Sequence, residues 1–274
     1  TQIENIKILE ESAFNIKSKD NVISHLEFHQ KVPFLLNIEV DYEDNELVLE
    51  FTGKVLGSDY PKLISIETIK QCFININNMG ICLLDIDAIM DDASVVKCDV
   101  TQDVCCDDVP ALTKYIASNI INYREYIART LRNSNFVVEK NVTTRGYKKR
   151  LTIYNKQKEM NKRENSRYMT EYNIPPNTFE NICRFELNLN STAQIKKSLG
   201  ISDTSLQSVL TATNNPIRDF LDDVVADSNY TIPLTDKQSY FTALVLRDCD
   251  YDIHKVEAKM RQLYSKGTNL SKIM

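Results

Sequence analysis

Alternating apolar and polar positions mark six segments of the chain as β-strands. Successive side chains of a strand point to opposite faces of a sheet, so alternation is typical of a strand with one face in the core. The six segments are residues 34–40, 47–52, 95–103, 136–139, 151–154 and 182–189. They predict a protein with a mostly antiparallel sheet.

Apolar residues at helical spacing predict helices between and after these strands. Before Gly200 the predicted helices are 65–77, which begins at a Ser-x-x-Thr cap, 111–131, 155–167 and 192–199. Beyond Gly200 the pattern is mostly helical, over 204–211, 216–226, 237–246 and 253–265. Because the two kinds of element do not alternate regularly, we expect an α+β fold. We place a domain boundary near residue 200, between a sheet-containing domain, 1–200, and a helical region, 201–274.

Three of the predicted strands carry one polar face each. An antiparallel sheet that is covered on one side produces such a pattern by itself. If the three strands are neighbours, however, one open face gathers the acids, cations and tyrosine of a metal-assisted phosphoryl-transfer site. The polar positions are Lys97, Asp99, Thr101 and Asp103, then Arg150, Thr152, Tyr154 and Lys156, and finally Arg184, Glu186, Asn188 and Asn190.

The acids on this face are candidate metal ligands. Asp99 and Asp103 are separated by about 13 Å along a strand, which is too far for both to bind one ion without a bulge. We therefore predict that Asp99 and Glu186 form the ligand pair, and that Asp103 lies at the periphery of the metal site or beside DNA. Oxygen ligands favour Mg²⁺ or Mn²⁺ over zinc.

Tyr154 is the candidate nucleophile on the same face. A free tyrosine has a pKa of about 10 and is a poor nucleophile at neutral pH. With a metal-bound phosphate nearby, we expect Lys156 and Arg150 to favour its phenolate and to offset the charge that builds up on the scissile phosphate. The alternative interpretation is a tyrosine at a strand edge that forms a hydrogen bond at the surface.

A basic tract lies within a chain whose net charge is negative. The 274 residues carry a formal charge of -5, and 42% of them are hydrophobic, enough for one sizeable core or a domain with an appendage. Within this acidic chain, residues 140–167 contain Arg145, Lys148, Lys149, Arg150, Lys156, Lys158, Lys162 and Arg163. Such a tract indicates a polyanionic partner, and the alternative is a solvated helix face.

Several classes of protein are disfavoured. No apolar run approaches the roughly 20 residues that span a bilayer, and the first residues lack a signal-peptide profile, so we expect no membrane partner and a cytoplasmic location. The seven cysteines show no CxxC spacing and indicate reduced thiols, with adjacent Cys105 and Cys106 as an alternative redox pair. Neither common glycine-rich nucleotide-binding loop is present.

Four stretches together resemble the rolling-circle replication initiators of bacterial plasmids and filamentous phages, the phage/plasmid replication-protein family. They are LVLEFTGKVLGSDYPKLIS (47–65), VVKCDVTQD (95–103), LTIYNKQKE (151–159) and CRFELNL (183–189). The first is similar to the family's Ser/Thr-Gly-Lys segment with its Leu-Gly-x-x-Tyr turn. The others resemble its Arg-x-Asp-x-x-x-Asp strand, its Tyr-Asn/Asp-Lys-x-x-Glu motif and its Arg-x-Glu strand.

The resemblance, which covers about residues 34–200, implies a catalytic nicking and joining domain. Such an enzyme opens one strand at a double-strand origin, holds the 5′ end on a tyrosine and leaves a 3′-OH for synthesis. Matching positions imply that Tyr154 is that tyrosine, that Asp99 and Glu186 are the metal-site acids, and that Lys156 contacts the phosphate. The implied partners are double- and single-stranded origin DNA, a host replicative helicase and a second copy of the chain.

The candidate DNA contacts are cations on and around the polar face. They are Lys97, Lys148, Lys149, Arg150, Lys158, Lys162, Arg163 and Arg184. Residues 192–211 faintly resemble a helix-turn-helix, against which stands plain packing of two short helices. The apolar residues of the later helices are typical of a core, and a helicase or second subunit is the alternative partner for them.

Two departures from the family pattern leave alternatives open. Lys97 stands where the family usually has Arg, and no His-hydrophobe-His pair is present; His25 and His29 are three residues apart, and a β-hairpin is favoured there over a metal-binding helix. Other tyrosines, namely Tyr147, Tyr168 and Tyr172, are alternative nucleophiles. The alternative functions are a non-catalytic origin- or operator-binding protein and a structural protein with a solvated basic helix.

Overall fold

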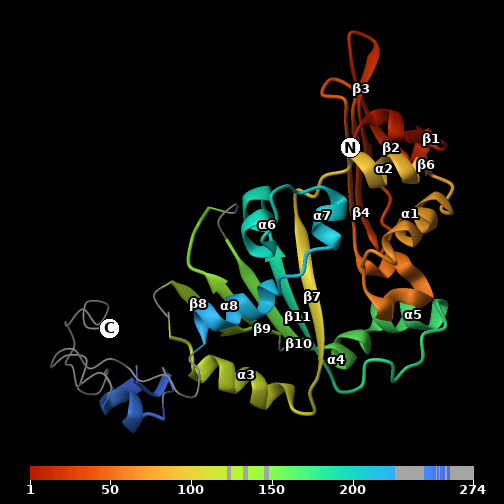
Figure 1. Ribbon diagram of the computed structural model, residues 1–274. Helices are drawn as coiled ribbons and strands as arrows, with labels where there is room; N and C mark the ends of the chain where they lie inside the picture. Colours follow the sequence, from red (N-terminus) through yellow and green to blue (C-terminus); the bar gives the residue numbers. More distant parts are fainter. Residues whose placement is uncertain are drawn as a thin grey trace.

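The computed structural model describes residues 1–121, 125–131, 135–144, 148–225, 244–250, 252, 254–256 and 258–259. Within these ranges the chain forms three antiparallel sheets with helices beside them (Figure 1). This confirms the predicted α+β fold. None of the described helices is both long and apolar enough to cross a membrane.

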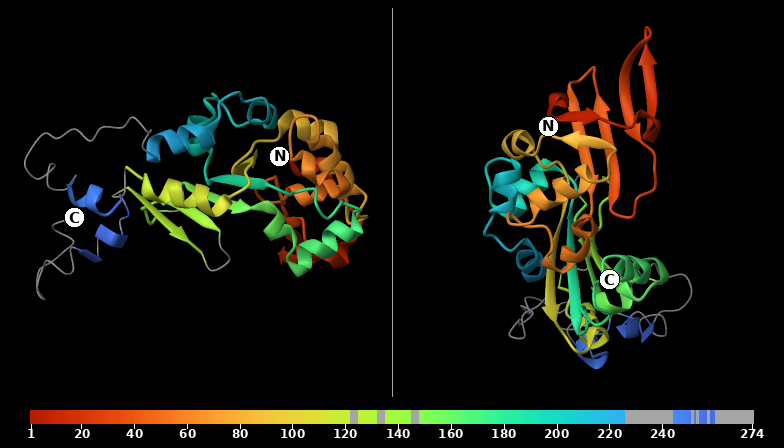
Figure 2. Two further views of the ribbon diagram at one scale, coloured as in Figure 1. Left: turned by 90° about the horizontal axis from the view of Figure 1, so that it is seen from below. Right: turned by 90° about the vertical axis from the view of Figure 1, so that its right-hand side faces the viewer.

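The first 95 residues build one core around a four-stranded sheet. Its strands follow the order of the chain: β2 (Phe14–Lys19), β3 (Val22–Phe28), β4 (Leu35–Asp41) and β5 (Glu46–Phe51). The same core includes residues of a two-stranded sheet, β1 (Ile6–Ile8) with β6 (Cys82–Leu84), and of the helices α1 (Ile69–Asn77) and α2 (Ile86–Asp92). The 3-10 helices η1 (Ile3–Asn5) and η2 (Glu11–Ala13) also contribute to it. The β2–β3 hairpin projects away from the rest of the molecule (Figure 2, right).

A five-stranded sheet carries the three polar strands. Its order is β7 (Cys98–Cys105), β11 (Ile182–Leu189), β10 (Arg150–Asn155), β9 (Phe136–Lys140) and β8 (Tyr126–Thr130), with every neighbouring pair antiparallel. The apolar positions of β10 and β11 pack against three helices, α3 (Val109–Ser118), α6 (Thr192–Leu199) and α8 (Pro216–Val224). The polar positions therefore face the other way.

A third, smaller apolar cluster joins elements from both parts of the chain. It combines the 3-10 helix η3 (Gly53–Lys62) with α4 (Lys156–Met160), α5 (Arg163–Glu171) and the loop that precedes β11. Its members include Tyr60 of η3, Met160, Tyr168 and Phe179. This cluster lies beside one end of the polar face, because Tyr60 also contacts Arg184 of β11.

The helix predicted over 111–131 is wrong in its second half. Helix α3 ends at Ser118, and β8 begins at Tyr126 and pairs with β9. The helix predicted over 155–167 is two helices, because Lys162 has extended backbone angles and interrupts it. The remaining strands and helices predicted up to residue 225 occur where expected to within a few residues.

Residues 201–225 pack with the first 200, across the predicted domain boundary. Leu206 of α7 (Leu206–Leu210) belongs to the first core, while Ile217, Phe220 and Val224 of α8 belong to the second. The two helices within residues 192–211 thus pack against the cores, and the second of them, α7, has only five residues. The helices predicted over 237–246 and 253–265 lie largely outside the described residues.

Candidate active site on the polar face of the second sheet

The three polar strands are neighbours, as predicted. Tyr154 of β10 pairs with Arg184 of β11, and Thr152 pairs with Glu186. Across β11, Glu186 pairs with Thr101 of β7. Side chains that are paired across a sheet lie on the same face, so the acids, the cations and the tyrosine share one surface.

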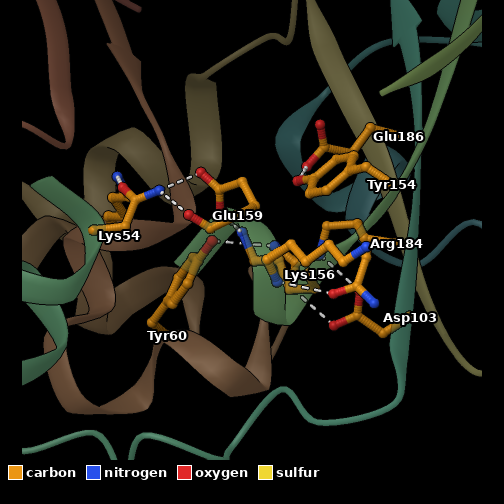
Figure 3. A network of polar contacts seen from close by, with 11 residues as sticks. Lys54, Tyr60, Asp103, Tyr154, Lys156, Glu159, Arg184 and Glu186 are labelled. Carbon is orange, nitrogen blue, oxygen red and sulfur yellow. Dashed lines mark hydrogen bonds and ion pairs between the residues drawn. The ribbon is translucent and has the colours of Figure 1, made fainter. Parts of the chain in front are cut away.

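Tyr154 contacts Glu186 directly. Its hydroxyl donates a hydrogen bond of 2.6 Å to Oε1 of Glu186 (Figure 3). Only 7% of Tyr154 is exposed, so the phenol is almost completely enclosed. The nucleophile predicted from the sequence thus contacts one of the two predicted metal ligands.

The surroundings of Tyr154 within the chain raise the pKa of its phenol. Burial raises the pKa of Tyr154, and the negative charge of Glu186 and its hydrogen bond raise it further, while the positive charge of Arg184 acts in the opposite direction. Of the two cations expected to act on Tyr154, Lys156 is paired with Glu159, and Arg150 lies four residues away along the strand. The phenol is therefore protonated at neutral pH.

Lys156 is enclosed in an aromatic cage. It is 2% exposed, and its Nζ donates a hydrogen bond of 2.8 Å to Oε2 of Glu159. The same ammonium lies 5.1 Å from the ring centre of Tyr60, 5.6 Å from that of Tyr154 and 5.8 Å from that of Phe179. Lys156, the predicted phosphate contact, is therefore paired with Glu159 and lies over the ring of Tyr154.

Glu159 is held from a second side by Asn165 of α5. The Asn165 amide donates to the backbone oxygen of Glu159 at 2.9 Å and also to its carboxylate, while its own oxygen accepts from Lys54 of η3 at 2.7 Å. Burial acts to raise the pKa of Glu159, but the charge and hydrogen bond of Lys156 outweigh it and leave that pKa lowered. Burial lowers the pKa of Lys54.

Arg184, a predicted DNA contact, and Asp103, the predicted peripheral acid, form a buried ion pair. Arg184 is 3% exposed, and its Nε and Nη2 donate to the two carboxylate oxygens of Asp103 at 2.6 and 2.7 Å. Nη1 donates to the hydroxyl of Tyr60 at 3.1 Å. Burial acts to lower the pKa of Arg184, but Asp103 raises it overall. Arg184 is thus buried and held by Asp103, and each carboxylate oxygen of Asp103 accepts one of its hydrogen bonds.

Asp99 and Glu186 are the acids left for a metal ion. Asp99 is exposed and accepts a hydrogen bond from Asn188, the residue paired with it on β11, so it lies diagonally across from Glu186. Burial raises the pKa of Glu186, and Asp99 adds to this. Mg²⁺ commonly takes one or two carboxylates from a protein and fills its other positions with water and substrate phosphate, so the pair fits Mg²⁺ or Mn²⁺. In the described part of the chain, no group of three or more His, Cys, Asp or Glu could hold a metal ion.

The other candidate DNA contacts divide into engaged and free cations. Lys97 contacts Glu50 at 2.6 Å, and Lys148 contacts the buried Glu139 at 3.2 Å, whereas Lys149 and Arg150 are half-buried. Burial lowers the pKa of Lys149. The exposed cations without an ion pair to a described residue are Lys158, Lys162 and Arg163.

The alternative nucleophiles and ligands lie elsewhere. The hydroxyl of Tyr168 donates to backbone oxygens of Lys54 and Gly57, at 2.7 and 3.1 Å, and the ring of Tyr172 packs against Gly57. Tyr147 lies outside the described residues. His25 is on β3, where it faces Glu39 at 3.3 Å, which agrees with the expected hairpin.

Sequence reasoning missed Tyr60 and Glu159 as parts of the site. Both lay in motifs that carried the resemblance, the Leu-Gly-x-x-Tyr turn and the segment after Tyr154. The i, i+3 spacing of Lys156 and Glu159 was the available signal for their ion pair. No family model matches the chain, and no curated protein and no solved structure matches it.

Proposed function

We propose that the protein is a metal-dependent, site-specific DNA nicking and joining enzyme that starts rolling-circle replication of a plasmid or phage in the bacterial cytoplasm. The observation that carries the proposal is the contact between the Tyr154 hydroxyl and Glu186, on a face that also presents Asp99. The resemblance to replication initiators supports the same function, since the motifs that carry it include all three residues.

In the proposed reaction, the phenol oxygen of Tyr154 attacks the scissile phosphorus and the bond between phosphorus and the 3′ oxygen breaks. The phenol proton leaves towards Oε1 of Glu186, which already accepts its hydrogen bond, and the 3′ oxygen takes up a proton from water. The 5′ end is then attached to Tyr154, and attack by a 3′-OH reverses the steps to join the strand. When bound, Mg²⁺ or Mn²⁺ would polarise the phosphate and offset the charge of Glu186 that raises the pKa of Tyr154.

The decisive test is covalent capture of a single-stranded origin oligonucleotide. Tyr154→Phe removes the phenol oxygen but keeps the ring beside Lys156, so we expect capture to be abolished and noncovalent binding to be nearly unchanged. Tyr115→Phe, at an exposed tyrosine of α3, is the matched control and should capture DNA like the wild type. Capture that persists in Tyr154→Phe would refute this tyrosine as the nucleophile.

A non-catalytic origin- or operator-binding protein is the second candidate function. The observation that favours it is the enclosed, protonated Tyr154, with both Lys156 and Arg184 held in ion pairs. Supercoiled plasmid that carries the origin, incubated with Mn²⁺, distinguishes the two functions. The enzyme produces nicked circles, and a pure binding protein produces none at any metal concentration.

A further inference from the structure

A groove of about 540 Å³ lies behind the strand that carries Tyr154. Its walls come from α3, from the facing ends of β8 and β9, and from the start of α4. Asn155 lines the groove, and because neighbouring residues of a strand point to opposite faces, the groove is on the other side of β10 from the Tyr154 hydroxyl.

The charges that line this groove are unbalanced. Its cations are Lys114, Lys158 and Lys162, and none of them forms an ion pair with a described residue. Its two acids are already engaged: Glu159 binds Lys156 and Asn165, and Asp252 accepts backbone N–H groups at the start of the short helical segment that follows it. Asp252 keeps its charge, but three lysines against this one acid leave the groove with an excess of positive charge.

The rest of the lining suits a nucleotide strand better than a small anion. Val109, Ala117 and Ala128 give the groove an apolar part on which sugars and bases can lie. The side-chain oxygen of Asn155 caps α4, which leaves its amide free to donate to a phosphate or a base. The volume is in the range of ligand pockets.

The groove is in contact with the candidate active site. Glu159 lines it, and the partner of Glu159 is Lys156, whose ammonium lies over the ring of Tyr154. Asn155 directly follows Tyr154 in the chain. A DNA strand with one phosphate at Tyr154 could thus place its neighbouring nucleotides in the groove by passing around the carboxyl end of β10.

We propose that this groove binds the single-stranded DNA segment next to the nicked phosphate, with its phosphates on Lys114, Lys158 and Lys162. The identity of the strand as the nicked one rests on the proposed function, whereas the affinity of the groove for single-stranded DNA does not. Lys114 is a contact that the sequence did not suggest, because it lies on α3, outside the basic tract.

The test is binding of the full chain to a fluorescent oligothymidylate of about 16 nucleotides, measured by anisotropy over a range of salt. Replacement of Lys114, Lys158 and Lys162 by Ala should weaken binding at least about tenfold at low salt and reduce the salt slope by about 2. The control replaces three exposed lysines of the first part of the chain, Lys7, Lys19 and Lys70, by Ala. It should bind like the wild type.

A second pair of variants leaves every lysine in place. Ala117→Glu puts an acid into the groove, and Ala111→Glu puts one on the same helix at an exposed position outside it. We expect only the first to weaken binding, with both variants giving wild-type circular dichroism spectra.

Three results would overturn the inference: a triple-lysine variant with wild-type affinity and slope, equal effects of the two glutamate variants, or a matched duplex that binds as tightly as the single strand and depends on the same lysines. If the wild type binds through the groove but never captures DNA covalently, the proposed function fails while the groove stands. If DNA is captured covalently but binding does not depend on the groove, the proposed function stands and the inference about the groove fails.

Discussion

Glu159 acts on the candidate active site through the buried Lys156. It neutralises Lys156, which is 2% exposed and lies among the rings of Tyr60, Tyr154 and Phe179. A buried ammonium without its acid is costly, because the charge has been removed from water without compensation.

Glu159→Gln should therefore destabilise the protein by about 3–5 kcal/mol, the usual effect of removing one partner of a buried pair. The double variant Lys156→Met with Glu159→Gln should recover much of this loss, since no uncompensated charge is left. Glu180→Gln, at an exposed glutamate without an ion pair to a described residue, is the control. Urea unfolding measures all four proteins, and equal stability of the wild type and Glu159→Gln contradicts the prediction.

The same ion pair predicts how stability changes with pH. The pKa of Glu159 is lowered from the ordinary 4.5 because the folded protein favours the ionised form, burial notwithstanding. Its contribution is thus fully present above pH 4.5 and is lost as the pH falls through the lowered, folded-state pKa. We expect the stability difference between wild type and Glu159→Gln to shrink with acidification below pH 4.5, whereas a constant difference would argue against the pair.

How far the sequence predicted the site can be seen from two pairs of residues. Alternation alone placed Tyr154 and Glu186 on polar faces, and their contact followed once the strands were neighbours. Alternation could not show that Arg184 is buried, because its burial depends on Asp103 across the sheet and on Tyr60 from a distant helix. The alternation of polar and apolar residues along a strand predicts which face of the sheet a side chain is on, but not whether another element covers that face.

At the level of elements, β4, β5, β7, β9, β10 and β11 were predicted as strands, whereas β1, β6, β8 and helix α2 were not, and one helix was predicted too long. The strands have one face in a core, so their apolar period is determined by burial. In residues 111–131 the apolar spacing continues past the true end of α3 at Ser118, and the pairing of β8 with β9 outweighs local helical preference. The pairing of a segment with another strand, even the next one along the chain, cannot be detected from the period of that segment alone.

Gly57 explains the Leu-Gly-x-x-Tyr turn in physical terms. It has a φ of 61°, and a Cβ atom there would lie 2.7 Å from Cδ1 of Tyr172. The glycine therefore lets η3 approach α5 closely and brings Tyr60, three residues later, to Arg184.

Gly57→Ala should thus destabilise the protein more than Gly80→Ala does. Both positions have positive φ, which costs an alanine about 1–2 kcal/mol, but nothing lies within 4 Å of a Cβ atom at Gly80. Only the first variant must displace a ring, and it should also loosen the cover over Tyr154. Thermal unfolding compares the two, and a smaller loss for Gly57→Ala would exclude a tight η3–α5 contact.

At the level of the whole molecule, two apolar cores are joined by η3 and the helices that follow Tyr154. The hydrogen bonds between the two parts include Lys54 to Asn165, Tyr168 to the backbone of Lys54, and Arg184 to Tyr60. The candidate active site lies at this junction, so its cover is built from both parts of the chain.

A chain that ends at residue 200 should not fold, contrary to the boundary suggested by the sequence. It lacks Ile217, Phe220 and Val224 of α8, which cover the apolar face of the second sheet. A chain that ends at residue 225 keeps every member of that cluster and should retain a cooperative melt by circular dichroism. Cooperative unfolding of the 200-residue chain would restore the original boundary.

The seven cysteines are free thiols, and they differ in their surroundings. Burial raises the pKa of Cys82 and Cys98 to about 11 and that of Cys72 and Cys183 to about 12, which makes these thiols slow to react. Cys105 is exposed at the end of β7, two residues beyond Asp103. The protein thus has a natural attachment point for a maleimide dye near the candidate active site, and no cysteine has to be introduced to follow the arrival of DNA by fluorescence.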